Sequence, residues 1–250
     1  MQPYFFPYLG HFALIANVAA WIVFDVTQYT PRTWINRNRV LHPTSGTSWV
    51  SIALKNSSIS IKIHEARVFD VAVAARSTLG KLSHYRRKAP HAQEVEEIVK
   101  ATFAAVGDDE SLVALNVAGL DAVCSYLGVP FRRTICSQMN LRLPDRLRPG
   151  EWAPEIASRV GATTYLNPIG GRALFSVEEF AKRGVALEFL KVKDFSYPTG
   201  SLPFIPNLSI LDVLMWNRPE VVRRALQTNS SIIAGVSAEE SVDSVRRQRL

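Results

Sequence analysis

Short apolar runs typical of β-strands alternate with longer helical patterns along most of this chain. Trp21–Asp25, Phe131–Cys136 and Val185–Val192 are typical of buried strands. The apolar spacing predicts helices over Leu9–Ala20, Val71–Phe103 with a break at Lys88–Pro90, Leu112–Leu127, Trp152–Val160, Ser176–Arg183, Ser209–Trp216 and Glu220–Leu226. Strands that alternate with helices indicate a largely parallel sheet covered on both faces. We therefore predict an α/β fold, specifically an open, largely parallel, Rossmann-like three-layer sandwich.

Two further strand-like segments follow each other closely near residue 50. Trp49–Leu54 is apolar and Ile59–Ile63 alternates apolar with polar residues, so the pair could form an antiparallel excursion from the main sheet. Hydrophobic residues make up 47% of the chain and charged residues 20%, a balance that supports a packed core. We predict one catalytic domain over residues 1–227 and a flexible, polar tail over residues 228–250.

The chain is basic, with 29 Lys and Arg against 22 Asp and Glu and a formal charge of +7. The basic residues cluster at Arg86–Lys88, Arg132–Arg133, Arg223–Arg224 and Arg246–Arg249. No nucleic-acid-binding module accompanies these clusters, so we do not expect a nucleic-acid partner. They are either solvated surface charge or, in part, a binding site for a phosphorylated ligand, because arginine suits bidentate phosphate recognition.

No segment of the sequence has the length and apolar character of a membrane span. The run Phe12–Phe24 is too short for one, is interrupted by Asn17 and lacks the features of a signal peptide, so we expect a cytoplasmic protein. Cys124 and Cys136 form no CxxC motif and are interpreted as buried thiols. The five histidines lack metal-ligand spacing, so no metal site is predicted.

The opening segment Gln2–Phe12 contains two prolines, a glycine, a histidine and five aromatic residues at the start of a predicted helix. This composition indicates a shaped loop, and a loop that leads into a helix N-terminus can bind an anion. We count Gln2 and Tyr4 as candidate substrate-binding residues and His11 as a candidate base. Pro7-x-x-Gly10-His11 also partly resembles the nucleotide-binding loop of HIGH-type nucleotidylyltransferases. The alternative is a capping loop with His11 in the core.

The segment Asp25–Arg39 is richer in hydrogen-bonding groups than a simple connection requires. It follows the end of a predicted strand, where ligands bind in open α/β sheets. Arginines and asparagines recognise phosphates and carbonyls, and aromatic rings can stack on a base or sugar. The candidates are Asp25 and Tyr29 for catalysis and Gln28, Arg32, Trp34, Asn36, Arg37 and Asn38 for substrate binding. The alternative is a polar loop held by its own hydrogen bonds.

A second candidate site follows the predicted strand Thr163–Leu166. The Pro/Gly turn Asn167–Gly171 would expose backbone N–H groups beside Arg172, which suits a phosphate or carboxylate. Tyr165, Gly170, Gly171 and Arg172 are therefore candidate substrate-binding residues, and an ordinary tight turn is the alternative.

These motifs resemble the WbqC-like protein family. The family's QPyFFPylGyf, fDdvQY and WxNRNrI segments correspond to Gln2–Phe12, Asp25–Tyr29 and Trp34–Arg39, and the likeness continues through Tyr85–Pro90, Tyr126–Gly128, Gly161–Leu166, Gly170–Arg172 and Phe204–Asp212. Family members usually carry a short apolar strand before the first segment, so the resemblance indicates a truncated or misassigned start at Met1. His11 stands where an aromatic residue is commoner in the family.

The resemblance implies a role in O-antigen or other polysaccharide biosynthesis, or in natural-product biosynthesis. Its proposed reaction is that of a transferase that acylates or aminoacylates an amine on a nucleotide-linked amino sugar or a related small molecule. Such a reaction requires a base for the amine and stabilisation of an oxyanion. We assign the base to Asp25 or His11, phosphate or carboxylate binding to Arg32, Arg37 and Arg172, and substrate positioning to Tyr29 and Tyr165.

Three alternatives stay open. The chain could be an adenylate-forming or nucleotidyl-transfer enzyme that uses ATP, or a cyclase or dehydratase of a natural-product pathway. It could also be a non-catalytic protein that binds an acidic acyl-carrier protein through its basic clusters. The sequence requires no cofactor and leaves homo-oligomer formation open.

Overall fold

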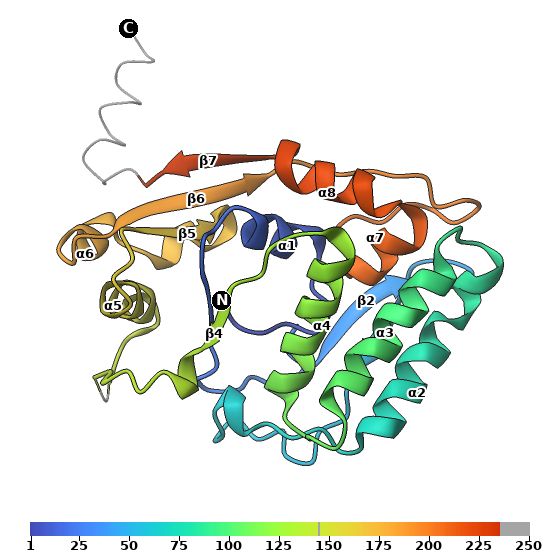
Figure 1. Ribbon diagram of the computed structural model, residues 1–250, viewed down its shortest axis with the longest axis horizontal. Coiled ribbons are helices and arrows are strands. Elements are labelled where there is room, and N and C mark those ends of the chain that lie inside the picture. Colours follow the sequence, from blue (N-terminus) through green and yellow to red (C-terminus); the bar gives the residue numbers. More distant parts are fainter. Residues whose placement is uncertain (145, 236–250) are drawn as a thin grey trace, which may run out of the picture. The chain divides into compact units, whose positions relative to one another are not determined.

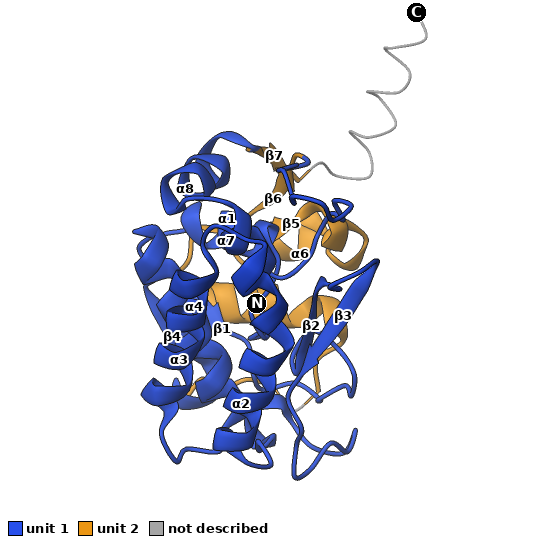
Figure 2. Cartoon of the chain, turned by 90° about the vertical axis from the view of Figure 1, so that its right-hand side faces the viewer, with its two compact units in different colours: residues 1–139, 194–229 blue, residues 140–193, 230–250 orange. Residues whose placement is uncertain are grey.

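A computed structural model describes residues 1–144 and 146–235 of the chain (Figure 1). These residues form two compact units (Figure 2). Unit 1 consists of Met1–Met139 and Asp194–Asn229, and unit 2 consists of Asn140–Lys193 together with the segment from Ser230 onward. The chain therefore leaves unit 1 after Met139, builds most of unit 2 and then returns.

Unit 1 is built mainly from helices. They are α1 (Leu9–Ala16), α2 (Val71–Leu82), α3 (Ala92–Val106), α4 (Leu112–Leu127), α7 (Ile210–Trp216) and α8 (Pro219–Thr228), with short 3-10 helices at Ile63–Glu65, Ser83–Arg87 and Cys136–Gln138. Helix α3 packs between α2 and α4, as Figure 1 shows, and α8 packs against α1 and α4. The predicted helices of this unit are confirmed, although α1 ends earlier than expected.

Local sequence signals explain where α4 begins and ends. The Ser111 side chain accepts a hydrogen bond from the Ala114 N–H and so caps the helix. Gly128 ends it in the left-handed conformation at a φ of 64°, which glycine adopts without strain. The apolar face between these residues is buried, with Leu112, Leu120 and Val123 fully inaccessible.

Two small sheets complete unit 1. β1 (Trp21–Val23) pairs in parallel with β4 (Arg133–Ile135), so the carboxyl ends of these strands meet at one edge. β2 (Arg37–Leu41) and β3 (Thr47–Ser51) form an antiparallel hairpin in which Arg39 lies opposite Trp49. The β2 strand was predicted as part of a polar loop. It is a strand because Asn38 and Val40 turn inward and are buried.

The described residues of unit 2 form a three-stranded sheet. β6 (Ala186–Val192) pairs in parallel with β5 (Thr164–Pro168) and antiparallel with β7 (Ser230–Ala234). The helices α5 (Trp152–Arg159) and α6 (Val177–Ala181) accompany the sheet, with 3-10 helices at Pro149–Glu151 and Ile169–Leu174.

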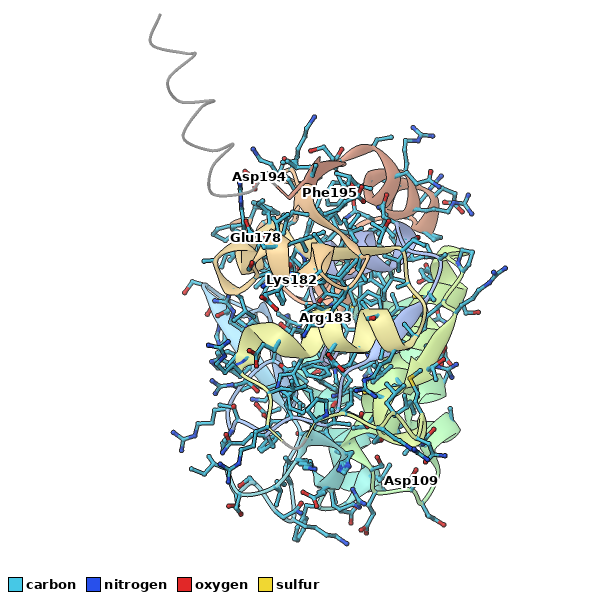
Figure 3. The ribbon with its side chains drawn as sticks, turned by 90° about the vertical axis from the view of Figure 1, so that its left-hand side faces the viewer. Asp109, Glu178, Lys182, Arg183, Asp194 and Phe195 are labelled. Carbon is cyan, nitrogen blue, oxygen red and sulfur yellow. The ribbon has the colours of Figure 1, made fainter. Side chains whose placement is uncertain are left out.

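The core of unit 2 forms around the fully buried ring of Phe180, which packs with Val185, Leu187 and Phe189. At the surface of the unit, the guanidinium of Arg183, labelled in Figure 3, forms ion pairs with Glu155 and Glu179. This unit therefore has both an apolar core and a paired charged surface of its own.

The structure confirms the mixture of helices and strands but does not confirm a Rossmann-like three-layer sandwich. The strands of the described residues form three small sheets instead of one open sheet. β1 and β4 are three residues long and form a two-stranded sheet with each other in the described part of the chain. Within the predicted tail, Ser230–Ala234 forms β7, and residues 236–250 lie outside the described residues.

The predicted strand Ile59–Ile63 is wrong. These residues form a turn that leads into the 3-10 helix Ile63–Glu65, and Gln28 bridges to Lys62. Ile59 is 62% exposed while Ile63 is buried, so the apolar residues do not share a buried face that would hold a strand in a sheet.

Candidate anion-binding site

The β2–β3 hairpin presents arginines on one face and buries polar and apolar side chains on the other. Side chains alternate along a strand, so Arg37 and Arg39 lie on the face opposite to the buried Asn38 and Val40. Trp49 lies opposite Arg39 in the register of the two strands, and directly paired residues share a face. The hairpin thus brings the indole ring of Trp49 next to two cations that lie ten or more residues before it in the sequence.

Trp34 joins these three residues and completes a set that we call the arginine–tryptophan face: Trp34, Arg37, Arg39 and Trp49. The guanidinium carbon of Arg37 lies 4.0 Å from the centre of the Trp49 ring. That of Arg39 lies 5.5 Å from the Trp34 ring and 5.9 Å from the Trp49 ring. The two indoles lie 5.7 Å apart and are tilted by 32°. Both remain near 40% exposed, which is unusual for large aromatic side chains in a packed protein.

The two arginines of this face have no anionic partner. Within residues 1–144 and 146–235, neither forms an ion pair or a side-chain hydrogen bond, and the Nε atoms of both are buried without a partner. Arg86 and Arg133 differ, because they pair with Glu96 and Asp121. Two adjacent, unneutralised guanidiniums with free N–H groups form a site suited to an anion.

Among the described residues, two polar side chains next to the face each have a buried polar atom without a hydrogen-bond partner. One such atom is the hydroxyl of Tyr29. Burial raises the pKa of this hydroxyl, although the charge of Arg37 opposes the shift, so Tyr29 stays protonated and can donate a hydrogen bond. The amide of Asn36 donates to the Ile52 carbonyl at 3.1 Å, but its Oδ1 is buried and free. Buried polar atoms without partners are rare and are often satisfied by a ligand or water.

The buried side of the hairpin holds the N-terminal segment in place. The Nδ2 atom of Asn38 donates to the carbonyls of Phe5 at 3.1 Å and Phe6 at 2.7 Å, and Ser209 Oγ also donates to the Phe6 carbonyl. From α4, Asn116 Nδ2 donates to the Pro3 and Ile35 carbonyls. These bonds keep Phe6 at a φ of 37°, a conformation that non-glycine residues seldom adopt.

The end of β2 is anchored by the buried carboxylate of Asp212 on α7. One of its oxygens accepts hydrogen bonds from the Tyr85 hydroxyl and the Leu41 N–H, and the other accepts from the Tyr197 hydroxyl at 2.7 Å. Burial raises the pKa of Asp212, and these hydrogen bonds partly oppose the shift. The strand that carries Arg37 and Arg39 is therefore held on its buried side and at its end.

Comparison with known proteins places this chain in a family. The sequence model of the WbqC-like protein family matches residues 2–224. The chain belongs to the WbqC-like protein family. It is 27% identical over 218 residues to "Uncharacterized protein Rv1507c" of Mycobacterium tuberculosis (strain ATCC 25618 / H37Rv), a match that covers 86% of this chain and 90% of that relative. No solved structure matches the chain. The family is associated with biosynthetic functions.

Asp25 of this WbqC-like protein lies just beyond the end of β1 and is fully buried. Its two carboxylate oxygens accept hydrogen bonds from the backbone N–H of Ser137 at 2.9 Å and the Ser137 hydroxyl at 2.5 Å. Ser137 follows β4, so Asp25 ties together the carboxyl ends of the two parallel strands. Both of its oxygens are engaged within unit 1, and a catalytic role for Asp25 stays a prediction.

His11 lies in the core of unit 1 and is 1% exposed. Its ring centre lies 5.0 Å from that of Trp21 and 5.5 Å from that of Tyr4, and its Nε2 has no partner in the described part of the chain. Burial, together with the positive charge of the chain's amino terminus, lowers the pKa of His11 to about 3. The imidazole is therefore neutral at neutral pH and can accept a hydrogen bond or proton only from an adjacent buried group.

The other predicted residues of unit 1 make local contacts. The Tyr4 hydroxyl donates a long hydrogen bond of 3.4 Å to Gln2 Oε1, and Gln28 donates to the Ile59 carbonyl at 2.5 Å. Arg32 is exposed and has a φ of 59°. Of the residues predicted from the sequence, Trp34 and Arg37 belong to the arginine–tryptophan face, Tyr29 and Asn36 lie next to it, and Asn38 supports it from the buried side.

The second set of predicted residues lies in unit 2. The ring of Tyr165 stacks on Phe180 at 5.1 Å, its hydroxyl bonds to Asn167 Oδ1, and burial raises the pKa of that hydroxyl. β5 extends to Pro168, so Gly170, Gly171 and Arg172 lie in the following 3-10 helix rather than in a tight turn. Tyr165 packs in the core of unit 2, whereas Arg172 is exposed.

The sequence reasoning missed Trp49 and did not single out Arg39 as a site residue. The Arg37-x-Arg39 alternation is a signal for a strand with a charged face, but the buried Asn38 between them obscured it. Trp49 joins the face only through the register of the hairpin. The described residues contain no group of three or more His, Cys, Asp or Glu side chains placed to hold a metal ion. No helix in that part of the chain is both long and apolar enough to span a membrane.

Proposed function

We propose that this protein is a biosynthetic transferase that forms an amide by acylating or aminoacylating an amine, such as that of an amino sugar, on a small anionic molecule. The arginine–tryptophan face carries the proposal, because two guanidiniums without a carboxylate partner suit the binding of an anionic substrate. Membership in a family associated with biosynthetic functions supports the same direction.

Each residue of the face has a role that follows from its chemistry. Arg37 and Arg39 hold the anionic group, and the indoles of Trp34 and Trp49 pack against the rest of the substrate. The protonated hydroxyl of Tyr29 can donate to a substrate oxygen. Amide formation also needs a base for the amine, and that role stays assigned to Asp25 or His11 as a prediction from the sequence.

The test is amide formation by the purified full-length protein. Amino sugars with and without phosphate groups are incubated with acyl thioesters, or with amino acids and ATP, and products are detected by mass spectrometry. Once a product is found, Arg37→Gln and Arg39→Gln should each lower kcat/KM by about tenfold or more, because each removes one charge-assisted contact. Arg218→Gln, which changes an exposed arginine just before helix α8, is the matched control and should retain activity.

The result that contradicts the proposal is equally direct. If both arginine variants turn over the substrate at the wild-type rate while the protein is active, the face is not the substrate site. If no combination of amine and acyl donor yields an amide, the transferase assignment is wrong.

A further inference from the structure

The arginine–tryptophan face concentrates positive charge in a way that constrains its ligand. Arg37 and Arg39 are two residues apart on one strand face, so their Cα atoms lie about 7 Å apart. Both guanidinium carbons lie within 5.9 Å of the same Trp49 ring centre. Like charges this close repel each other, and no carboxylate of the described residues forms an ion pair with either arginine. A ligand with one negative charge would leave one arginine unneutralised.

Two separate guanidiniums on one strand face favour two linked phosphates, because each arginine can then bind its own phosphate. A diphosphate that joins two organic groups carries one negative charge on each of two adjacent phosphates. Each guanidinium can bind one phosphate through parallel N–H bonds. The terminal nitrogens of both arginines make no hydrogen bond in the described part of the chain and, unlike the Nε atoms, are not enclosed, so they are open to such a ligand.

The indoles add a requirement for a flat ring beside the phosphates. Arg37 covers one side of Trp49 at 4.0 Å, whereas Trp34, which is 40% exposed, lies 5.5 Å from Arg39 and 5.7 Å from the Trp49 ring. An exposed indole next to a phosphate site is the arrangement on which a nucleobase stacks, because bases and indoles both present large π faces.

We infer that the arginine–tryptophan face binds the nucleoside diphosphate part of a nucleotide-linked substrate, with Arg37 and Arg39 on the two phosphates and Trp34 against the base. This inference rests on the proposed function for the identity of the site as a substrate site. It adds the chemical class of the group that anchors the substrate, and it places the amine that is acylated beyond the distal end of the diphosphate.

The experiment measures binding to the full-length protein by isothermal titration calorimetry and by quenching of tryptophan fluorescence. The probes are uridine, adenosine, guanosine and thymidine diphosphates, the matching monophosphates and nucleosides, and inorganic pyrophosphate. At least one nucleoside diphosphate should bind about tenfold more tightly than both its monophosphate and pyrophosphate, while its nucleoside binds more weakly still. Affinity should fall as the salt concentration rises.

Variants separate the two parts of the inference. Arg37→Gln and Arg39→Gln should each weaken nucleoside diphosphate and pyrophosphate binding by about tenfold. Trp34→Ala should weaken the nucleoside diphosphate by about tenfold and leave pyrophosphate unchanged, because only the stacking contact is lost. Arg218→Gln should change neither. Thermal unfolding of each variant checks that the hairpin is intact.

Three outcomes would overturn the inference. The first is that no nucleoside diphosphate binds at millimolar concentration, and the second is that monophosphates or pyrophosphate bind as tightly as the nucleoside diphosphates. The third is that Trp34→Ala weakens the binding of the nucleoside diphosphate and of pyrophosphate by the same factor. The proposed reaction fails separately. Tight nucleoside diphosphate binding without any amide product supports this site and contradicts the transferase assignment. Efficient amide formation on substrates without a diphosphate supports the transferase assignment and contradicts the nucleoside diphosphate site.

Discussion

Replacing Asn38 by alanine should destabilise unit 1 by about 3 kcal/mol. The Asn38 side chain is 3% exposed and makes three hydrogen bonds: its Nδ2 donates to the Phe5 and Phe6 carbonyls, and its Oδ1 accepts from the Arg39 N–H. Alanine leaves the buried Phe5 carbonyl and the partly buried Arg39 N–H without these partners.

The magnitude follows from the two groups that lose their only side-chain partner. A buried donor or acceptor left unsatisfied costs about 1–3 kcal/mol. The Phe6 carbonyl adds less, because Ser209 Oγ still donates to it at 2.7 Å. Partial release of the strained backbone at Phe6, whose φ is 37°, offsets part of the loss. The sum is about 2–4 kcal/mol.

Urea unfolding followed by circular dichroism and tryptophan fluorescence measures this difference. Asn17→Ala is the matched control: its Nδ2 also donates to a carbonyl, that of Ala13 at 2.8 Å, but Asn17 is exposed, so water replaces the lost bond and the change should stay below about 1 kcal/mol. A loss below about 1 kcal/mol for Asn38→Ala, with an unchanged denaturant slope, would refute the reasoning that this side chain holds the N-terminal segment.

Two further predictions concern other parts of the chain. In unit 2, Gly171→Ala should lower the free energy of unfolding by about 1–3 kcal/mol, because the added Cβ would lie 2.3 Å from the Nδ2 of the buried Asn167. A Cβ added at Gly170 would have no neighbour within 4 Å, so Gly170→Ala should be neutral. Thermal unfolding measures both variants. The pKa of His11 is lowered from 6.5 to about 3 in the folded protein, so the unfolded chain takes up this proton first, and stability falls as the pH drops from 6.5 to about 3. The free energy of unfolding of the wild-type protein should therefore fall by up to about 1.4 kcal/mol more per pH unit in this range than that of His11→Phe. If urea unfolding at several pH values shows the same pH dependence of stability for both proteins, His11 is not a buried, neutral imidazole.

The helices could be predicted because their signals are local. The start of α4 at Leu112 and its end at Leu127 depend on a capping serine and a glycine within the same short stretch of chain. The pairing of strands depends on residues far apart in the sequence, so local patterns predict one open sheet where the described residues form three small sheets. Ile59–Ile63 shows the same limit, because an alternating pattern forms a strand only where a partner and a buried face exist.

For the candidate site, the residue types alone indicate which chemistry is available: Trp34, Arg37 and their polar neighbours are dense enough to indicate binding of an anion. How these side chains are arranged depends on the fold. The hairpin register placed Trp49 against Arg37, and burial turned Asn38 from a candidate ligand contact into a support for the N-terminal segment. The physical reason is that residue types set what a side chain can bind, whereas strand register and burial set which side chains meet and which of their polar atoms remain free.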